Sequence, residues 1–446
     1  MSETPLENPS LSSGAALWSR AKKIIPGGNQ LLSKRPERFL PGLWPSYYSR
    51  AKGCEVWDLD NRHYYDFAQM GVGACVLGYA DDEVNAAVIQ AVTNGSMCTL
   101  NCPEEVQLAE RLLQLHPWAG MARFARTGGE ACAIAIRIAR AASGKDRIAL
   151  CGYHGWHDWY LSANLSDSAS LDGQLLPGLD PAGVPRTLSG TALTFNYNDL
   201  PALQRLASEF GSEIGVIVME PQRGNAPSPG FLEGVREIAT RLGAVLILDE
   251  VTSGFRMNLG GIHLTLGLSP DMAVFGKGLG NGYAISAILG RTDVMDHAQS
   301  TFISSTFWTE RIGFAAALAV LDKMEKHNVP SWLVATGEQI NDGWQQLSQK
   351  HGIPIHISGI PPLTHLSFLV PNAQALQTLY AQEMLAKGFL LGASVYTTLA
   401  YTPQIIRHFL DQSDAAFAVL RRALDDASVE SLLKGGVADA GFKRLT

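Results

Sequence analysis

The central part of the chain shows two recurring hydrophobic patterns: short runs that are apolar throughout, and longer stretches with helical spacing. The apolar runs predict strands at residues 122–125, 147–151, 214–219, 244–248, 272–275 and 285–289. Residues 130–142 and 231–242 have the spacing of helices. Strands without a polar face, separated by helices, are typical of a mostly parallel sheet that is buried on both faces. We therefore expect an α/β domain here.

The two ends of the chain have a different pattern. Residues 15–25 have helical spacing, and residues 55–58 and 64–67 flank an Asp-Asn turn pair, which predicts a hairpin. After a helical stretch at 312–326, strands are predicted at 354–357, 364–370 and 389–391, and helices at 373–387 and 411–424. We therefore expect an N-terminal arm and small-domain segment at 1–75, a large domain at 76–325 and a C-terminal small domain at 326–446.

Composition limits the partners that the protein can have. Of its 446 residues, 46% are hydrophobic and 17% are charged, and the net charge is -7 without long runs of one sign. This balance argues against nucleic acid or an anionic membrane surface as a partner. The polar start, and the lack of an apolar run near the about 20 residues that span a bilayer, favour a cytoplasmic protein. Cys98 and Cys102 have no second Cys/His pair at zinc spacing, so we expect no metal site.

Residues that follow the strands are the candidate site, because ligands of parallel sheets bind at the carboxyl ends of the strands. After the strand at 122–125 come Thr127, Gly128 and Gly129, at the start of a helix. Free backbone N–H groups and the helix dipole bind phosphate at such a place. The alternative is a plain capping box formed by Thr127 and Glu130.

An aromatic loop, residues 152–160, follows the strand at 147–151. A flat side chain such as Tyr153 can stack on a planar ligand there. The loop could instead form a packed aromatic cluster, or His154 and His157 could bind a metal. The metal is the weakest of these alternatives, because only Asp158 stands nearby as a third ligand.

Two further strands end in acids, Glu220 and Asp249. A carboxylate at the end of an apolar strand is costly to bury without a cation or a donor, so Asp249 needs a partner. A magnesium-binding role of the Walker B type is the alternative, but the chain lacks the matching Gly-Lys-Ser/Thr loop. Lys277 stands between two glycines after the strand at 272–275, and is either a reactive amine or a solvated loop lysine.

Together these features specify one type of ligand. A phosphate cradle, a stacking ring, a buried carboxylate and a lysine, each at the end of a different strand, fit a phosphorylated aromatic cation held by a lysine. Pyridoxal 5'-phosphate (PLP) has this chemistry. It forms a Schiff base with a lysine, and a carboxylate keeps its pyridine nitrogen protonated so that the ring accepts electrons.

The same residues resemble those of the class III aminotransferases, PLP enzymes of fold type I, and most closely their glutamate-1-semialdehyde 2,1-aminomutase branch. The segments that resemble the whole class are Thr127-Gly128-Gly129-Glu130-Ala131 in place of Ser-Gly-Thr-Glu-Ala, Tyr153-His154-Gly155, Glu220-Pro221, Asp249-Glu250-Val251, Ser253-Gly254-Phe255-Arg256 and Lys277. The segments that resemble the aminomutase branch are Ile25-Pro26-Gly27-Gly28, Tyr197-Asn198-Asp199-Leu200 and Pro229-Gly230-Phe231-Leu232. The resemblance implies a large domain around a mostly parallel seven-stranded sheet. It also implies a smaller α+β domain formed by the C-terminal part with the N-terminal segment.

The resemblance implies roles for the residues around the cofactor ring. Lys277 would form the Schiff base and move the proton between carbon atoms, and Asp249 would pair with the pyridinium. Tyr153 would stack on one face of the ring and Val251 would pack on the other. Glu220 matches a glutamate near the cofactor whose role is less defined.

The resemblance also implies how the phosphate is bound. The amides of Gly128 and Gly129, with the Thr127 hydroxyl, would hold it. Thr306 would reach the phosphate of a neighbouring subunit. That last contact implies a homodimer with shared active sites.

The chain departs from the aminomutase pattern on the substrate side. Where that branch has an arginine for the substrate carboxylate, this chain has Lys34 beside Arg35, and lysine does not replace a bidentate arginine. No acid occurs in residues 392–402, where the branch has a glutamate. The aromatic side chains of Trp156, Trp159, Phe307 and Trp308 suggest a flat or ring-shaped acceptor such as a keto sugar; the alternative is that they simply pack. The candidate substrate-binding residues are Lys34, Arg35, Trp156 and Phe307.

We therefore expect an aminotransferase that passes an amino group from a small-molecule donor to a carbonyl acceptor through Lys277. An intramolecular 2,1-aminomutase that uses the same lysine is the alternative within the family. A PLP-binding protein without turnover is the alternative of another class, and it is disfavoured because every residue that the catalytic step needs is present.

Overall fold

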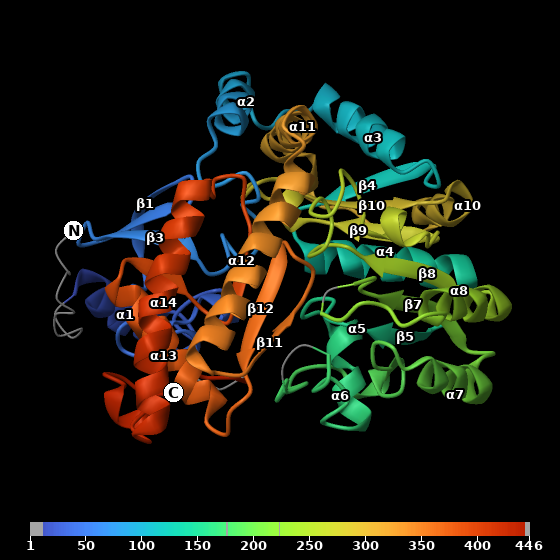
Figure 1. Cartoon of the computed structure of the whole chain (residues 1–446). Helices are drawn as coiled ribbons and strands as arrows, with labels where there is room; N and C mark the ends of the chain where they lie inside the picture. The colour runs from blue at the N-terminus through green and yellow to red at the C-terminus, as the bar shows by residue number, and fades with distance from the viewer. Residues whose placement is uncertain (1–11, 175–176, 223, 442–446) are drawn as a thin grey trace. The chain divides into compact units, whose positions relative to one another are not determined.

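The computed structural model describes residues 12–174, 177–222 and 224–441 (Figure 1). The chain divides into two compact units. The terminal unit consists of Met1–Asp81 and Trp332–Thr446, and the central unit of Asp82–Ser331. None of the helices in the described ranges has the length and apolar character that crossing a membrane requires.

The central unit is built on a seven-stranded sheet of order β4-β10-β9-β8-β7-β5-β6. Its strands are β4 (Met121–Ala125), β5 (Arg147–Cys151), β6 (Ala192–Thr194), β7 (Ile214–Met219), β8 (Val245–Asp249), β9 (Met272–Phe275) and β10 (Ser286–Gly290). Neighbouring strands from β6 to β9 are parallel, whereas β10 is antiparallel to β4 and β9. The prediction of a mostly parallel, seven-stranded α/β sheet is confirmed. The hydrophobic pattern did not locate β6, because its 3 residues are too few to show a period.

Helices cover both faces of this sheet, which explains why its strands are apolar throughout. Successive residues of a strand point to opposite faces. Val245 and Ile247 of β8 pack in one hydrophobic cluster with α4, whereas Leu246 and Leu248 pack in another with α7 and α8. The helices of the central unit are α2 (Asp82–Thr93), α3 (Pro103–Leu115), α4 (Gly128–Ser143), α5 (Asp158–Leu161), α6 (Ala163–Ser166), α7 (Leu200–Phe210), α8 (Phe231–Leu242), α9 (His263–Leu266), α10 (Thr292–Met295) and α11 (Arg311–Lys326).

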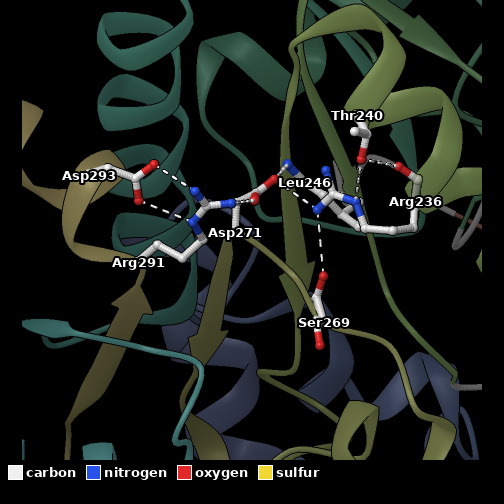
Figure 2. A network of polar contacts seen from close by, with 7 residues as sticks. All are labelled: Arg236, Thr240, Leu246, Ser269, Asp271, Arg291 and Asp293. Atoms are coloured by element: carbon white, nitrogen blue, oxygen red, sulfur yellow. Dashed lines mark hydrogen bonds and ion pairs between the residues drawn. The ribbon is translucent and has the colours of Figure 1, made fainter.

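At the amino-terminal start of β9, a polar network surrounds Asp271 (Figure 2). Its Oδ2 accepts hydrogen bonds from Arg236 Nη1 at 2.9 Å and from the Leu246 amide at 2.8 Å. Its Oδ1 accepts from Arg291 Nη1 at 3.1 Å, and Arg291 is also paired with Asp293. Donors from α8, β8 and the turn after β10 thus converge on one buried carboxylate.

The terminal unit contains two small sheets, of orders β1-β2-β3-β13 and β11-β12-β14. Their strands are β1 (Tyr48–Lys52), β2 (Glu55–Asp58), β3 (His63–Phe67), β11 (Ile355–Ser358), β12 (Leu363–Phe368), β13 (Phe389–Leu391) and β14 (Ser394–Tyr396), and the helices are α1 (Ser13–Ile24), α12 (Val329–His351), α13 (Ala373–Ala386) and α14 (Pro403–Asp425). The predicted hairpin is present as β2 and β3. Because β13 pairs with β3, the C-terminal part and the N-terminal segment share one sheet. Their shared core includes the Phe67 ring, stacked on Tyr401 and Phe409.

Two helices of the terminal unit differ from the prediction. α14 begins at Pro403 rather than at residue 411, because the Thr402 side chain caps the Ile405 amide and proline suits the first helical position. α12 was not predicted, although Pro330 lies in its first turn, where a proline does not break a helix.

Candidate active site

The carboxyl ends of the central strands bring most of the candidate residues to one edge of the sheet. Thr127 follows β4, Tyr153 follows β5, Glu220 follows β7, Asp249 ends β8 and Lys277 follows β9. The shared direction of these strands puts all five positions at the same edge, where ligands of α/β sheets bind.

The start of α4 forms the capping box and still leaves two amides for a ligand. Thr127 Oγ1 accepts from the Glu130 amide at 3.3 Å, and Glu130 Oε2 accepts from the Thr127 amide at 3.0 Å. The amides of Gly128 and Gly129 take no part in this box. The helix start is therefore complete by itself, and the N–H groups of its first two residues are suited to an anion.

Val251 connects this helix start to the lysine segment. A Cβ atom at Gly128 would lie 2.8 Å from Val251 Cγ1, and a Cβ atom at Gly276 would lie 3.4 Å from the same methyl group. Val251 therefore packs closely against both glycines. Through this one side chain the start of α4, the end of β8 and the residue before Lys277 are in contact.

Asp249 is buried and has the partner that its position requires. Its Oδ2 lies 2.8 Å from His154 Nδ1, while His154 Nε2 lies 3.1 Å from the Cys151 carbonyl oxygen. Both ring nitrogens of His154 therefore lie within hydrogen-bonding distance of an oxygen acceptor. Asp249 also accepts from the Val251 amide at 3.0 Å and from Cys132 Sγ at 3.4 Å.

These contacts determine the charge of Asp249. Burial by itself would raise the pKa of this carboxyl, but the hydrogen bond and the charge of His154 outweigh it, and the pKa lies below its ordinary value. Burial, and then the Asp249 charge, raise the pKa of the Cys132 thiol. The thiol therefore stays protonated and donates a hydrogen bond to Asp249. Asp249 is therefore a carboxylate at neutral pH, the group that a protonated pyridine nitrogen requires.

Lys277 is held in an unusual backbone conformation at the end of β9. It opens the short 3₁₀ helix Lys277–Leu279, and its φ of 28° lies in the region that L side chains rarely adopt. Such strain is found at functional sites, where the surrounding structure maintains it. Lys277 Nζ donates to Thr252 Oγ1 at 2.8 Å, which directs the amine to the segment that follows Asp249.

Glu220 fixes the loop that carries Tyr153. Its Oε2 accepts from the Tyr153 amide at 3.2 Å, and a Cβ atom at Gly152 would lie 2.8 Å from the same oxygen. The Gly152 amide donates to Gln174 Oε1 at 2.7 Å. The Tyr153 ring packs edge-on against Tyr160. Glu220 and its neighbours thus set the position of the aromatic ring through the backbone.

His157, considered above as a metal ligand, lies beside the start of α4. A Cβ atom at Gly129 would lie 3.0 Å from its Cε1 and 3.1 Å from its Nδ1. That Nδ1 atom is buried and has no hydrogen-bond partner among the described residues. Trp156 stacks on the ring and is itself 70% exposed. In the described part of the chain, no group of three or more His, Cys, Asp and Glu side chains is arranged to hold a metal ion.

The amides of α4, the Asp249 carboxylate and the Lys277 amine fit PLP. The amides suit its phosphate, the carboxylate suits its pyridinium and the amine suits its aldehyde.

Thr306 and Phe307 lie on the surface of the central unit, in the 3₁₀ turn Thr306–Thr309. Phe307 is 67% exposed. Arg126 holds this turn, since it donates to the carbonyl oxygens of Phe307 at 2.7 Å and of Trp308 at 3.2 Å. The residue before the capping box therefore also anchors the segment that carries Thr306.

Lys34 and Arg35 belong to the terminal unit. Lys34 ends the 3₁₀ helix Leu32–Lys34, and the Arg35 guanidinium lies against Gly27. Their predicted contact with the substrate stays a prediction.

Sequence reasoning did not identify three of the side chains that act on the two central groups. His154 and Cys132 bind Asp249, and Thr252 binds Lys277. The adjacency of His154 to Tyr153 was an available signal. Cys132 and Thr252 had none, because only the fold brings them to their partners.

Comparison with known proteins identifies similar chains. A family model described as aminotransferase class-III matches residues 42–418. A 3-aminobutyryl-CoA aminotransferase of Cloacimonas acidaminovorans is 32% identical over 425 residues, which cover 91% of this chain and 98% of that protein. A 2'-deamino-2'-hydroxyneamine transaminase of Streptomyces kanamyceticus is 34% identical over 353 residues, which cover 79% of this chain and 85% of that protein.

Solved structures with the same fold include PLP enzymes. The FumI protein of Sphingopyxis sp. MTA144, in its PLP internal aldimine form, is 26% identical with a TM-score of 0.85, covering 95% of this chain and 98% of that chain. An omega-transaminase from Sphaerobacter thermophilus is 26% identical with a TM-score of 0.81, covering 92% and 98%. A glutamate-1-semialdehyde aminomutase from Pseudomonas aeruginosa PAO1 is 20% identical with a TM-score of 0.78, covering 91% and 94%, and shares the fold.

Proposed function

The chain belongs to the class III aminotransferases, PLP-dependent enzymes that transfer an amino group, and we propose that Lys277, Asp249 and the start of α4 form its active site. The observation that carries this proposal is the position of Val251, which packs against both Gly128 and Gly276. The side chain that covers one face of the cofactor ring thereby lies between the phosphate cradle and the lysine.

When bound, PLP supplies an electron sink that stabilises negative charge at the substrate carbon. Lys277 Nζ would hold the cofactor and would serve as the group that moves the proton at that carbon, and Thr252 Oγ1 accepts a hydrogen bond that orients the amine. Asp249, kept ionised by His154, holds the proton on the ring nitrogen.

The remaining residues bind and orient the cofactor. Tyr153, positioned by Glu220, stacks on the face opposite Val251. The amides of Gly128 and Gly129 bind the phosphate together with Thr127, whose hydroxyl also serves the capping box. The resemblance to class III aminotransferases and the position of these side chains at one edge of the sheet both support these roles.

The direct test removes the lysine. Lys277→Ala should abolish the visible absorbance band of the lysine-bound cofactor and the transfer reaction, because Lys277 is the lysine that directly follows β9. Lys326→Ala on α11, where the side chain is 64% exposed, is the matched control and should keep both. A visible band that persists in Lys277→Ala would overturn the assignment of this lysine.

We propose transfer between two molecules, from an amino donor to a separate carbonyl acceptor. With donor alone, the purified enzyme should release one keto product per active site and keep the nitrogen on its cofactor. Turnover of an amino aldehyde without any donor would instead identify an intramolecular aminomutase.

We also propose that two chains form a homodimer with shared sites. α2 and α3 both pack on α11 (Figure 1), and exposed apolar side chains occur on α2, on α3, between them and in the Thr306 region. They are Ile89, Val92, Leu100, Val106, Phe302 and Phe307. Apolar side chains exposed in this number are typical of a surface that a partner covers. Sedimentation at equilibrium should give twice the 48.1 kDa mass of the chain.

Mixed dimers test whether Thr306 acts in the neighbouring site. Thr306→Glu would place a carboxylate against the phosphate and should inactivate that site. Dimers of one Lys277→Ala chain and one Thr306→Glu chain should regain activity, since one site then has both wild-type residues. A mixture that stays inactive would place Thr306 in its own chain's site.

The exposed rings of Trp156 and Phe307 support a flat or ring-shaped carbonyl acceptor, with Lys34 and Arg35 as further candidates for substrate binding. A screen of amino donors with keto sugars and aromatic ketones tests this proposal. A cytoplasmic location remains a prediction.

A further inference from the structure

His157 has a place in the fold that the transfer reaction described above does not use. In an α-helix, each Cα–Cβ bond tilts toward the amino terminus, so a side chain on the second residue of α4 would point toward the ligand end of the helix. At Gly129 no side chain fills that position. The Cε1–Nδ1 edge of His157 fills it instead, 3.0 and 3.1 Å from where the Cβ atom would stand.

The nitrogen at this edge lacks a partner. His157 Nδ1 is shielded from solvent, and no acceptor or donor among the described residues reaches it. A buried polar atom without a hydrogen bond destabilises the folded protein, so an unpaired one needs an explanation. The neighbouring carboxylate of Glu130 does not provide it, because that group is turned to the amides of Arg126 and Thr127.

We propose that His157 is a further binding residue for the 5'-phosphate of the cofactor, to which its Nδ1–H donates from the position that a side chain at residue 129 would otherwise occupy. This inference rests on the proposed active site. In this arrangement both α4 and the loop after β5 contribute hydrogen-bond donors to the phosphate. Burial lowers the pKa of His157, against the charges of Glu130 and Asp158, so the ring acts as a neutral N–H donor.

If His157 binds the phosphate, its loss should weaken the binding of phosphorylated ligands and leave the binding of unphosphorylated ligands unchanged. Apoprotein would be titrated with pyridoxamine 5'-phosphate and with pyridoxamine, neither of which needs Lys277 to bind. His157→Leu keeps an apolar volume under Trp156 but removes the donor. We expect it to raise the Kd of the phosphorylated ligand about tenfold, the usual effect of a hydrogen bond to a charged group. The Kd of pyridoxamine should not change.

Two rescue variants sharpen the test. His157→Asn keeps an N–H group near the Nδ1 position and should bind both ligands as the wild type does. Gly129→Ser with His157→Ala returns a donor from position 129 and should recover most of the lost affinity. Gly129→Ser alone should weaken binding, because its Cβ meets the imidazole ring.

Equal weakening of both ligands in His157→Leu would overturn the proposal, because the ring would then only pack against Trp156. An unchanged Kd for pyridoxamine 5'-phosphate would overturn it as well. Failure of the proposed active site itself has a different signature: wild-type protein would give no visible band with PLP, or Lys277→Ala would keep one.

Discussion

Asp249 and Asp271 are two buried carboxylates at opposite ends of adjacent strands. They differ in their hydrogen-bond donors, and this difference fits a proposed functional role for Asp249 and a structural role for Asp271. Asp249 ends β8 and is 4% exposed, and Asp271 precedes β9 and is 6% exposed. Asp271 is paired with two arginines and an amide (Figure 2), and a guanidinium does not lose its proton. Asp249 is paired with an imidazole, a thiol and an amide. The first set of donors links α8, β8 and the turn after β10, whereas the second set keeps Asp249 ionised, as its proposed contact with the cofactor requires.

The largest effect is expected from Asp249→Asn. The amide has the shape of the carboxylate but cannot hold the proton on the pyridine nitrogen. Transfer should slow by roughly 10²- to 10³-fold, the usual result of losing one preorganised electrostatic partner. Single-turnover kinetics with a saturating donor measures this effect, and a circular dichroism melt checks that the protein is folded. A rate within threefold of the wild type would remove Asp249 from the mechanism.

Asp271→Ala should lower the stability of the protein and leave the transfer rate unchanged, the reverse of what we expect for Asp249→Asn. The Leu246 amide and the two arginines lose their acceptor, which should lower the free energy of unfolding by about 2 kcal/mol. The transfer rate per folded molecule should stay at the wild-type value. Urea unfolding measures the free energy of unfolding, and an activity assay on the same protein sample measures the transfer rate. A loss of rate as large as that of Asp249→Asn would contradict the division between the acids.

His154→Gln tests the charge that supports Asp249. Because the pKa of Asp249 is lowered in the folded protein, its stabilising contribution is present above the ordinary value of 3.8 and is lost as the pH falls through the folded value. Without the hydrogen bond from His154 the folded pKa of Asp249 rises, so acid release of the cofactor should begin at a higher pH. At neutral pH we expect about tenfold weaker cofactor binding, the effect of one charge-assisted hydrogen bond. If the variant released its cofactor at the same acidic pH as the wild type, His154 would contribute packing alone and no hydrogen bond that matters for the charge of Asp249.

The smallest effect is expected from Cys132→Ala, which removes a weak S–H donor from Asp249. Cofactor affinity should fall by about threefold or less, since a thiol is a weaker donor than a hydroxyl. Cys132→Ser should bind at least as tightly as the wild type, because its hydroxyl can replace the bond. Equal losses in both variants would indicate packing rather than hydrogen bonding.

The sequence was informative where a local pattern determines the structure. The apolar runs predicted the central strands because both faces of the sheet are buried, and strand direction then placed Thr127, Tyr153, Asp249 and Lys277 at one edge. The hydrophobic pattern does not indicate β6 or the start of α14, because a 3-residue strand shows no period and a polar cap such as Thr402 is not part of a hydrophobic pattern.

Contacts between side chains far apart in the sequence could not be predicted in this way. The hydrogen bond from Cys132 to Asp249 joins the second turn of α4 to the end of β8, and the sequence of neither segment indicates this contact. The close approach of His157 to Gly129 depends on how the loop after β5 folds back. A resemblance to known enzymes supplies roles for matching residues, but His157 and Cys132 stand outside that set.

The capping box at α4 has a consequence for how the enzyme acquires its cofactor. Thr127 and Glu130 complete the helix start by themselves, so the alignment of the Gly128 and Gly129 amides does not require a bound ligand. A cradle that exists beforehand demands little conformational entropy from the arriving phosphate. Capture of the phosphate should therefore be a rapid, single-step encounter, and the slower covalent attachment at Lys277 should determine how long the holoenzyme takes to form.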